Sequence, residues 1–389
     1  MTPYQPAPAP ARPAPAQPAR QVVITGLGAV TAAGRGTGAL LGLVLAGEPA
    51  FAPVTRFAVQ RCRATVAAAL PGSPVLADEL AAVIDDACAA AAMGWADRNG
   101  TGLLMALHSD AAAARDPRAR QATGSLAGEM AQRCGLVGLL RTYTTACVAA
   151  STATADAAAM IVAGQADRVV VAAGYLVDQD SFAVFDAGRA LAADGQLRPF
   201  SKGRRGMLLG DGLAAIVLES AAMASHRGAP PLARLAGWGR AGDAYHVCQP
   251  RPDGTGLARA IESALRRAQV GRGEVGYVNA SGSGTVFGDA AESAALHRTF
   301  GPAVRSIPVS STKSVHGHAL EASALLELVA TVLALRSGQL PVNAGFLAPD
   351  DECDLDLVLG TARQRRPGYA LSLNAAFGGA NTALLVGAA

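Results

Sequence analysis

The sequence predicts an α/β protein with one large core or two fused ones. Of its 389 residues, 51% are hydrophobic and only 16% are charged, which suffices for a large core and excludes a disordered chain. From Gln21 onward, short runs of β-branched residues alternate with alanine-rich segments of helical length. These runs end in glycine-rich or small-residue turns. Such turns place loops at one edge of a sheet, where α/β proteins usually build their sites.

Six segments have the pattern of strands, and several are apolar enough to be buried on both faces. They are QVVITGLG (21–28), DRVVVAAG (167–174), GLAAIVLES (212–220), EVGYVNASGSG (274–284), SIPVSSTK (306–313) and YALSLNAAFGG (369–379). The segments between them are predicted to be helices. The longest apolar stretch, 319–338, contains Glu321 and Glu327, which favours a buried helix and disfavours a membrane span. We therefore expect no membrane partner.

The ends of the chain suggest its division. Residues 1–20, MTPYQPAPAPARPAPAQPAR, alternate proline with alanine and lack the apolar core of a signal peptide. We expect a disordered, polyproline-like tail that carries no chemistry. Strand-rich endings near Ser220 and near Val386 suggest that the remainder consists of two similar halves.

The charge and the cysteine content exclude several classes of function. The net charge of +3 comes from 33 basic and 30 acidic residues that are interspersed, and only 4% of residues are aromatic, so nucleic acid is not an expected partner. The six cysteines show neither close pairing nor metal-ligand spacing. We therefore predict no disulfide framework and no metal site, and we expect the protein in the reducing cytoplasm.

One cysteine stands at the start of a predicted helix. Cys147 opens the small-residue run TACVAASTATADAAAMIVAG. If a strand ends near Thr145, the unpaired amides of the first helical turn and the helix dipole would both stabilise a thiolate. We then expect Cys147 to have the lowest thiol pKa of the six cysteines. The alternative is an ordinary buried cysteine, because cysteine is among the most buried residue types.

Several distant segments, taken in order, resemble β-ketoacyl synthases of the thiolase fold. They are QVVITGLGAVTAAG, TTAC before the small-residue helix, RPFSKGRRGMLLGDG, DAYHVCQPRPDG, VNASGSGTVFGDAAE with SSTKSVHGHAL, and AAFGGANTALLV. The resemblance covers nearly everything after the tail and is closest to the elongating type II ketosynthases. It implies two similar βαβ-rich halves, 21–225 and 226–389, stacked as α-β-α-β-α layers.

The resemblance also implies roles for individual residues. Cys147 matches the nucleophile that carries the acyl group, and its backbone N–H would form an oxyanion hole with that of Phe377. His318 matches a catalytic histidine, and Lys313 matches the lysine that supports the site. Phe377 matches a gate that moves when the acyl chain enters, and Gly378 and Gly379 follow it in the same substrate-binding turn.

Other residues of these motifs are expected to have structural roles. Asp289 and Glu292 would organise the loop near Lys313, and His316 would belong to the scaffold. Each catalytic assignment has an ordinary alternative: His318 could be a satisfied core histidine, Lys313 a surface lysine, and Phe377 a packing residue.

The chain also departs from the family pattern. Ser281 stands where the family ordinarily has a histidine that helps to decarboxylate the malonyl extender. Ser201 replaces an acid, and Glu321 replaces a glycine. The stretch before Cys147 is shorter than usual, which leaves the dimer interface and the chain-length preference open.

Two functions from different classes remain. The first is a condensing enzyme or acyltransferase that acts on carrier-protein-bound acyl thioesters in fatty acid or polyketide biosynthesis, with impaired malonyl decarboxylation or with transfer alone. The second is a partner subunit like the chain-length factor of heterodimeric ketosynthases. A thiolase fits the motif order less well. Either way we expect a homodimer or a heterodimer, an acyl carrier protein as partner, and no organic cofactor or metal, because the thioester on phosphopantetheine supplies the activation.

Overall fold

Most strands of the protein form one continuous mixed sheet, and two short pairs, β3 with β4 and β12 with β14, lie outside it. A computed structural model describes residues 20–107 and 122–389, so residues 1–19 of the predicted tail and part of the stretch before Cys147 lie outside it. Within these residues the sheet has 12 strands in the order β13-β11-β10-β15-β16-β9-β1-β8-β7-β5-β6, with β2 paired to β1.

The sheet consists of two halves with the same topology. In the first half β1 and β7 each pair antiparallel with β8, and β5 pairs parallel with both β7 and β6. In the second half β9 and β15 pair antiparallel with β16, and β10 pairs parallel with both β15 and β11. The halves join where β1 pairs with β9 at Val23↔Arg234 and Ile24↔Ala233. The two similar halves expected from the sequence are therefore confirmed, whereas their division into domains at 225/226 stays a prediction.

The first half comprises β1 (Val22–Thr31), β2 (Gly34–Arg35), α1 (Thr37–Ala46), β3 (Ala52–Pro53), β4 (Val66–Ala67), α2 (Leu76–Ala90), α3 (Trp95–Arg98), β5 (Gly102–Leu107), α5 (Ala122–Arg133), β6 (Leu140–Tyr143), α6 (Ala149–Val162), β7 (Arg168–Tyr175), α7 (Gln179–Ala187), β8 (Gly212–Ser220) and α8 (Ala221–His226). The second half comprises β9 (Ala233–Gly242), α9 (Thr255–Ala268), β10 (Val275–Asn279), α10 (Val286–Phe300), β11 (Pro308–Ser310), α11 (Lys313–His316), α12 (Ser323–Ser337), β12 (Gln339–Leu340), β13 (Asp356–Leu357), β14 (Arg363–Gln364), β15 (Tyr369–Ala376) and β16 (Ala380–Ala388).

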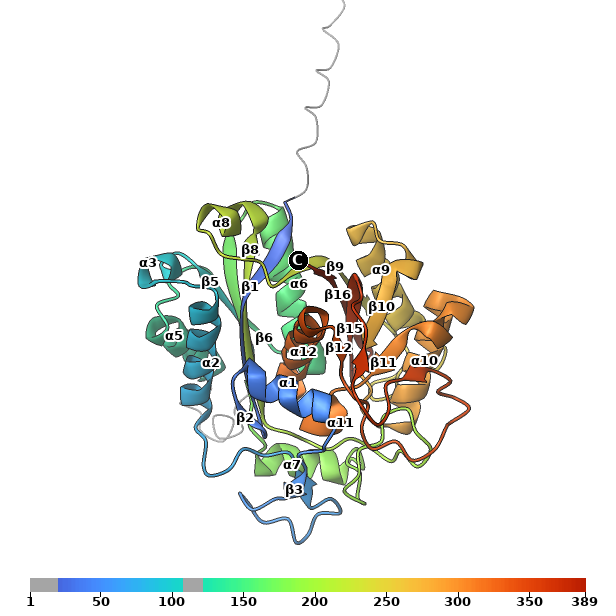
Figure 1. Cartoon of the computed structure of the whole chain (residues 1–389). Coiled ribbons are helices and arrows are strands. Elements are labelled where there is room, and N and C mark those ends of the chain that lie inside the picture. Colours follow the sequence, from blue (N-terminus) through green and yellow to red (C-terminus); the bar gives the residue numbers. More distant parts are fainter. Residues whose placement is uncertain (1–19, 108–121) are drawn as a thin grey trace, which may run out of the picture.

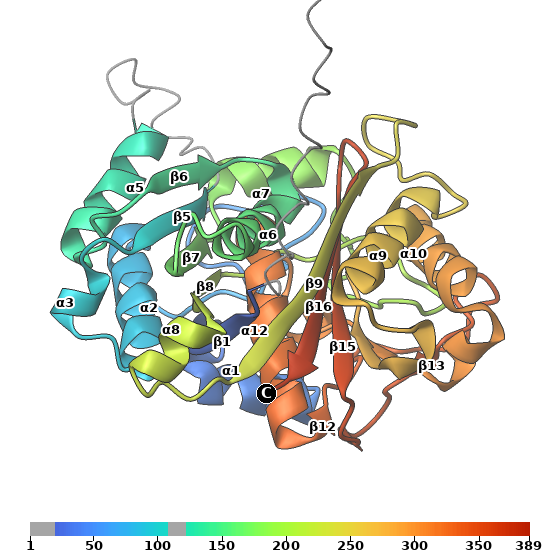
Figure 2. The same ribbon diagram turned by 90° about the horizontal axis from the view of Figure 1, so that it is seen from above.

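The helices and half-sheets stack in five layers. Helices α6 and α12 lie between the two half-sheets, α2, α3 and α5 lie outside the first, and α9 and α10 lie outside the second (Figure 1). Figure 2 shows α6 and α12 on one side of β9, β16 and β15, with α9 and α10 on the other side. This arrangement confirms the predicted α-β-α-β-α order.

The two central helices are buried because their sequences are apolar or small on every face. Every residue from Ser323 to Leu335 in α12 is buried, and ten of the 14 residues of α6 are buried, six of them alanines. The helix predicted over 319–338 is therefore confirmed, with its first turn tightened into a 3₁₀ turn at Leu320–Ala322. No helix of the described residues is long and apolar enough to span a membrane.

All six predicted strand segments form strands, β16 covers the strand-rich ending near Val386, and β6 ends close to Thr145, whereas β5 and β9 were not predicted. The sequence of β9, ARLAGWGRAG, is rich in glycine and alanine, which have low β-propensity. The structure explains two of its glycines, Gly237 and Gly239, because α9 packs directly on this strand. A Cβ atom at Gly239 would lie 1.9 Å from the carbonyl oxygen of Ala260 in α9. Close approach of helix and strand, and not strand propensity, selects glycine here.

We predict that Gly239→Ala destabilises the protein by about 1–3 kcal/mol, because α9 must move to accommodate the methyl group. Gly242→Ala, in the same strand, is the matched control, since no heavy atom lies within 4 Å of its Cβ position. Denaturant unfolding of both variants measures the difference. Equal midpoints for the two variants would show that the contact between α9 and β9 is loose.

Candidate active site

Cys147 lies on the connection between strand β6 and the central helix α6. Its backbone belongs to a 3₁₀ turn, Ala146–Val148, that leads directly into α6. Ala146 has φ +50, a left-handed conformation that costs a non-glycine residue free energy and that often marks a functional site. The turn thus holds the half-buried Cys147 at the head of the helix, as the sequence predicted.

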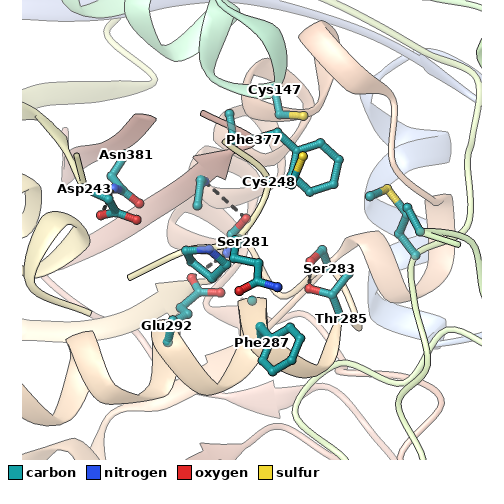
Figure 3. Close-up of a pocket in the computed structure, with 18 of the residues that line it drawn as sticks. Cys147, Asp243, Cys248, Ser281, Ser283, Thr285, Phe287, Glu292, Phe377 and Asn381 are labelled. Carbon is teal, nitrogen blue, oxygen red and sulfur yellow. Dashed lines mark hydrogen bonds between the residues drawn. The ribbon is translucent and has the colours of Figure 1, made fainter. Parts of the chain in front are cut away.

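The thiol opens into a cavity of about 330 Å³ whose walls come from both halves. Cys147, Ser281, His318 and Phe377 line this cavity. Figure 3 shows Cys147, Phe377 and Ser281 around it, together with the side chain of Cys248. The structure therefore brings together four of the residues that the resemblance singled out.

The hydrogen bonds of His318 fix its tautomer. Its Nδ1 accepts the backbone N–H of Leu320 at 3.0 Å and lies 3.1 Å from the hydroxyl of Ser323. Burial, followed by the positive charge of Lys313, lowers the pKa of His318 well below its ordinary value. The neutral ring therefore carries its proton on Nε2, where it can donate a hydrogen bond to an oxygen that gains negative charge.

Lys313 does not line the cavity but is buried behind it. Its Nζ donates to the backbone carbonyl of Ser281 at 2.8 Å and forms an ion pair with Glu327 Oε1 at 2.5 Å. The other carboxylate oxygen of Glu327 accepts a hydrogen bond from Asn374 at 2.6 Å. Lys313 therefore connects the Ser281 loop to α12 and, through Asn374, to β15.

Two buried carboxylates hold the loop that contains Ser281. Glu292 accepts the backbone N–H groups of Ser281 and Gly282, each at 2.7 Å. Asp289 accepts those of Gly284 at 3.0 Å and Phe200 at 2.8 Å. These contacts confirm the structural roles that were expected for Asp289 and Glu292. Burial raises the pKa of Glu292 to about 7 and that of Asp289 to about 6, against the opposing effect of these N–H donors.

Ser281 provides no imidazole, and among the described residues His318 is the only histidine that lines the cavity. Ser281 Oγ accepts the backbone N–H of Ala375 at 3.3 Å, which leaves the hydroxyl as a neutral group at the cavity wall. His316 is buried against Gly317 O at 2.8 Å and Thr312 Oγ1 at 3.1 Å, and it does not line the cavity. Burial lowers the pKa of His316 to about 3. His316 is a scaffold residue, as expected.

Phe377 stands at the cavity mouth with 46% of its surface exposed. Its ring stacks on that of Phe185, with centroids 6.2 Å apart. Gly378 and Gly379 have φ +85 and +75 and form the tight turn after it, but they do not line the cavity. Phe377 therefore lines the cavity, whereas the two glycines form the turn that follows it in the chain.

The expectation of a low thiol pKa at Cys147 was wrong. Burial raises the pKa of this thiol to about 12, and the negative charge of Glu321 adds to the rise. Lys313 and a backbone hydrogen bond oppose these effects without overcoming them. The helix start was predicted correctly, but the sequence could not show that a carboxylate from another part of the chain lies close to the sulfur.

Sequence analysis also missed several cavity residues. The carboxylate of Asp243 accepts a hydrogen bond from Asn381 at 2.8 Å, and both side chains lie on one wall of the cavity (Figure 3). Other lining residues that were not singled out are Cys248, Ser283, Thr285 and Phe287. All of these cavity residues lie within the motifs quoted in the sequence analysis. Membership of those motifs was therefore the signal that could have identified them. Ser201 lies outside the cavity, where its hydroxyl accepts the backbone N–H of Leu347 at 2.9 Å.

Comparison with known proteins identifies the family. The beta-ketoacyl synthase N-terminal domain matches residues 81–224, and the beta-ketoacyl synthase C-terminal domain matches residues 232–347. The ketoacyl synthase alpha subunit of the tetracenomycin polyketide synthase from Streptomyces glaucescens is 31% identical over 94% of this chain and 97% of its own length. Nodulation protein E of Rhizobium leguminosarum bv. trifolii is 40% identical over 66% of this chain, and that match spans 64% of the relative.

Solved structures agree with this assignment. The first shows a type II polyketide synthase acyl carrier protein in complex with its ketosynthase bound to the hexaketide, with TM-score 0.90, 26% identity, and coverage of 96% of this chain and 100% of that one. The ishigamide ketosynthase/chain length factor has TM-score 0.87 and 28% identity, and the match covers 96% of this chain and 100% of that one. The chain therefore belongs to the beta-ketoacyl synthase family and has its thiolase-like fold.

We predict that limiting iodoacetamide near neutral pH labels Cys248 before Cys147, because Cys248 is exposed whereas the raised pKa leaves Cys147 almost entirely as the unreactive thiol. Mass spectrometry of the labelled peptides decides the order. Buried Cys88 and Cys134 serve as unreactive internal references. Faster labelling of Cys147 would contradict the raised pKa and restore the original expectation.

Proposed function

We propose that the protein transfers acyl groups from carrier-protein-bound thioesters through an acyl intermediate on Cys147, as a β-ketoacyl synthase of fatty acid or polyketide biosynthesis. One observation carries this proposal: Cys147, at the head of α6, and the Nε2–H of His318 face the same cavity. A nucleophile and a neutral hydrogen-bond donor at one cavity are the parts that acyl transfer requires.

The transfer step follows from these groups. Cys147 Sγ attacks the thioester carbonyl, a new C–S bond forms, and the bond to the phosphopantetheine sulfur breaks. The proton of the Cys147 thiol ends on the released carrier thiol. The backbone N–H groups of Cys147 and Phe377 are the proposed donors to the oxyanion of the intermediate. Phe377, stacked on Phe185, is the proposed gate, and it must turn away to admit the acyl chain.

Decarboxylation of a malonyl extender is the step that we expect to be weak. His318 Nε2–H can donate to the enolate oxygen as carbon dioxide leaves, but the second donor position holds Ser281, whose hydroxyl does not titrate near neutrality. Loss of a positioned acid-base group typically slows a step by about 10²- to 10⁴-fold. The protein therefore favours acyl transfer, or slow condensation, on carrier-bound chains.

The proposed partners are an acyl carrier protein and a second ketosynthase-type subunit. Strand β6 ends the sheet of the described residues, and Leu140, Arg141 and Thr142 on it are exposed. An exposed edge strand is a ready surface for pairing with another chain, which supports a dimer. No cofactor or metal is needed, because the thioester is already activated. The cytoplasm remains the predicted compartment, since none of the six cysteines forms a disulfide.

A partner subunit like a chain-length factor is the second candidate. The raised pKa of Cys147 and the serine at position 281 favour it, because both weaken catalysis. Retention of the thiol at the cavity favours the enzyme, since a subunit that only shapes a tunnel does not need a nucleophile there.

Intact-mass analysis after incubation with acyl carrier proteins of several chain types tests the enzyme proposal. We predict an acyl adduct on the wild type and none on Cys147→Ala, with little carbon dioxide released from malonyl carrier protein. Ser281→His should raise that release, because it adds a donor worth about 1–4 kcal/mol of transition-state stabilisation.

Two results would contradict this account. Absence of any adduct from all carriers would favour the partner-subunit function. Rapid decarboxylative condensation by the wild type alone would show that Ser281 is no handicap, and the protein would then be an ordinary elongating enzyme.

A further inference from the structure

The cavity contains a second thiol besides that of Cys147. Cys248 lies on the loop 243–254, which joins β9 to α9 and contains no helix or strand. It is exposed, and it lines the same cavity as Cys147 (Figure 3). Of the six cysteines, all of which lie in the described residues, only these two line the cavity, and both are free. The cavity therefore brings together one accessible thiol and the proposed nucleophile.

Hydrogen bonds hold this loop against the turn that follows the proposed gate. The N–H of Asp243 donates to the carbonyl oxygen of Gly379 at 2.8 Å. The N–H of Gly378 donates to the carbonyl oxygen of Val247, also at 2.8 Å. Because Cys248 follows Val247 directly in the chain, these two main-chain contacts set its place at the cavity.

The other four cysteines are placed differently. Cys62 is half-buried and lines a separate pocket beside α7. Cys88 and Cys134 are buried in one hydrophobic cluster, and Cys353 is buried in another. Buried thiols in apolar surroundings are inert, whereas an exposed thiol is open to oxidants in water. The pair at the cavity therefore combines an exposed thiol with a second thiol that faces the same space.

We propose that Cys147 and Cys248 are a redox-modification site, at which hydrogen peroxide joins the two sulfurs in a reversible disulfide. Peroxide first oxidises the exposed Cys248 thiol to a sulfenic acid and releases water. The sulfur of Cys147 then attacks the sulfur of Cys248, so that the S–S bond forms and the S–O bond breaks. The hydroxide leaves as a second water with the proton of the Cys147 thiol. Disulfides in a reducing compartment are usually transient and redox-sensing, as this one is.

The shared cavity makes the second step feasible. Cys147 is mostly protonated, because burial raises its pKa to about 12, so it reacts slowly with an electrophile in solution. Confinement beside an electrophilic sulfur offsets this by raising the effective concentration by several orders of magnitude. Cys248 is thus the sensor, and Cys147 is the residue to which the oxidation is passed.

The bridge changes both the nucleophile and the mouth of the cavity. A disulfide holds its two Cα atoms about 4.4–6.8 Å apart, so it ties the loop 243–254 to the head of α6. The same loop is hydrogen-bonded to the gate turn, which the bridge therefore restrains as well. If Cys147 carries the acyl group, as proposed above, the bridge blocks acyl transfer until a thiol reduces it.

The test is peptide mapping of the oxidised wild type. The protein is treated with hydrogen peroxide at about pH 8.5, where more of each thiol is ionised. Free thiols are then blocked with N-ethylmaleimide, and the digest is analysed by mass spectrometry without reductant. We expect linked peptides that contain Cys147 and Cys248, and a fall from six to four free thiols because two of the six are joined. Dithiothreitol should restore all six.

Two variants sharpen the test. Cys248→Ser should form no bridge and should keep Cys147 as a free thiol after the same treatment. Cys62→Ser is the matched control, because Cys62 lies at a separate pocket, and it should form the bridge as the wild type does. The wild-type map decides even if a variant does not fold.

Absence of the linked peptides would overturn the inference, whether both thiols stay free or Cys248 is oxidised alone. A bridge from Cys248 to Cys62, or one that joins only two separate chains on a non-reducing gel, would also overturn it. Peptide mapping requires no carrier protein, so absence of an acyl adduct would remove the proposed function and leave this result unchanged.

Discussion

The buried ion pair between Lys313 and Glu327 is the interaction on which the site depends. The side chains are 1% and 0% exposed, and their charged atoms lie 2.5 Å apart. Through Lys313 the pair holds the carbonyl of Ser281, and through Glu327 it holds Asn374 on β15. Removal of two charges from water is costly, and such pairs contribute little net stability over apolar packing. This pair instead fixes where the Ser281 loop, α11, α12 and β15 lie around the cavity.

The duplicated fold explains why the reacting groups meet. Helix α6 in the first half and α12 in the second are the two central helices, and each follows an edge-side parallel strand of its half-sheet, β6 or β11. Cys147 lies on the turn that opens α6, and His318 lies just before the turn that opens α12. Since both helices are sandwiched between the half-sheets, their N-terminal ends converge on one cavity. Neither half alone contains a nucleophile together with the imidazole donor.

Much of this arrangement could be predicted from the sequence because it is encoded locally. Apolar β-branched runs gave the buried strands, and an apolar segment with two glutamates gave helix α12. The ordered motifs placed Cys147, His318, Ser281 and Phe377 at one site. Strand β9 was missed because its glycines reflect the close approach of α9, which is visible only in the folded chain.

The protonation of Cys147 could not be predicted for the same reason. A cysteine at a helix start normally has a lowered pKa, but partial burial and the negative charge of Glu321, which belongs to the other half of the chain, raise the pKa of this thiol. The roles of Asp243 and Asn381 were also hidden, because their hydrogen bond joins the end of β9 to β16, a neighbouring strand in the sheet that is distant in sequence. Local sequence patterns identify reactive groups, whereas the charges that tune them come from tertiary contacts.

The most direct measurement of the central claim is a double-mutant cycle on the ion pair, with the free energy of unfolding determined by denaturant for Lys313→Met, Glu327→Leu and the double variant. Each single substitution should cost about 3–5 kcal/mol, because it leaves the partner charge buried alone. The double variant should be more stable than the sum of the two losses by about 2–3 kcal/mol. Losses that add within about 0.5 kcal/mol would show that the two residues act independently, and would contradict a site built on this pair.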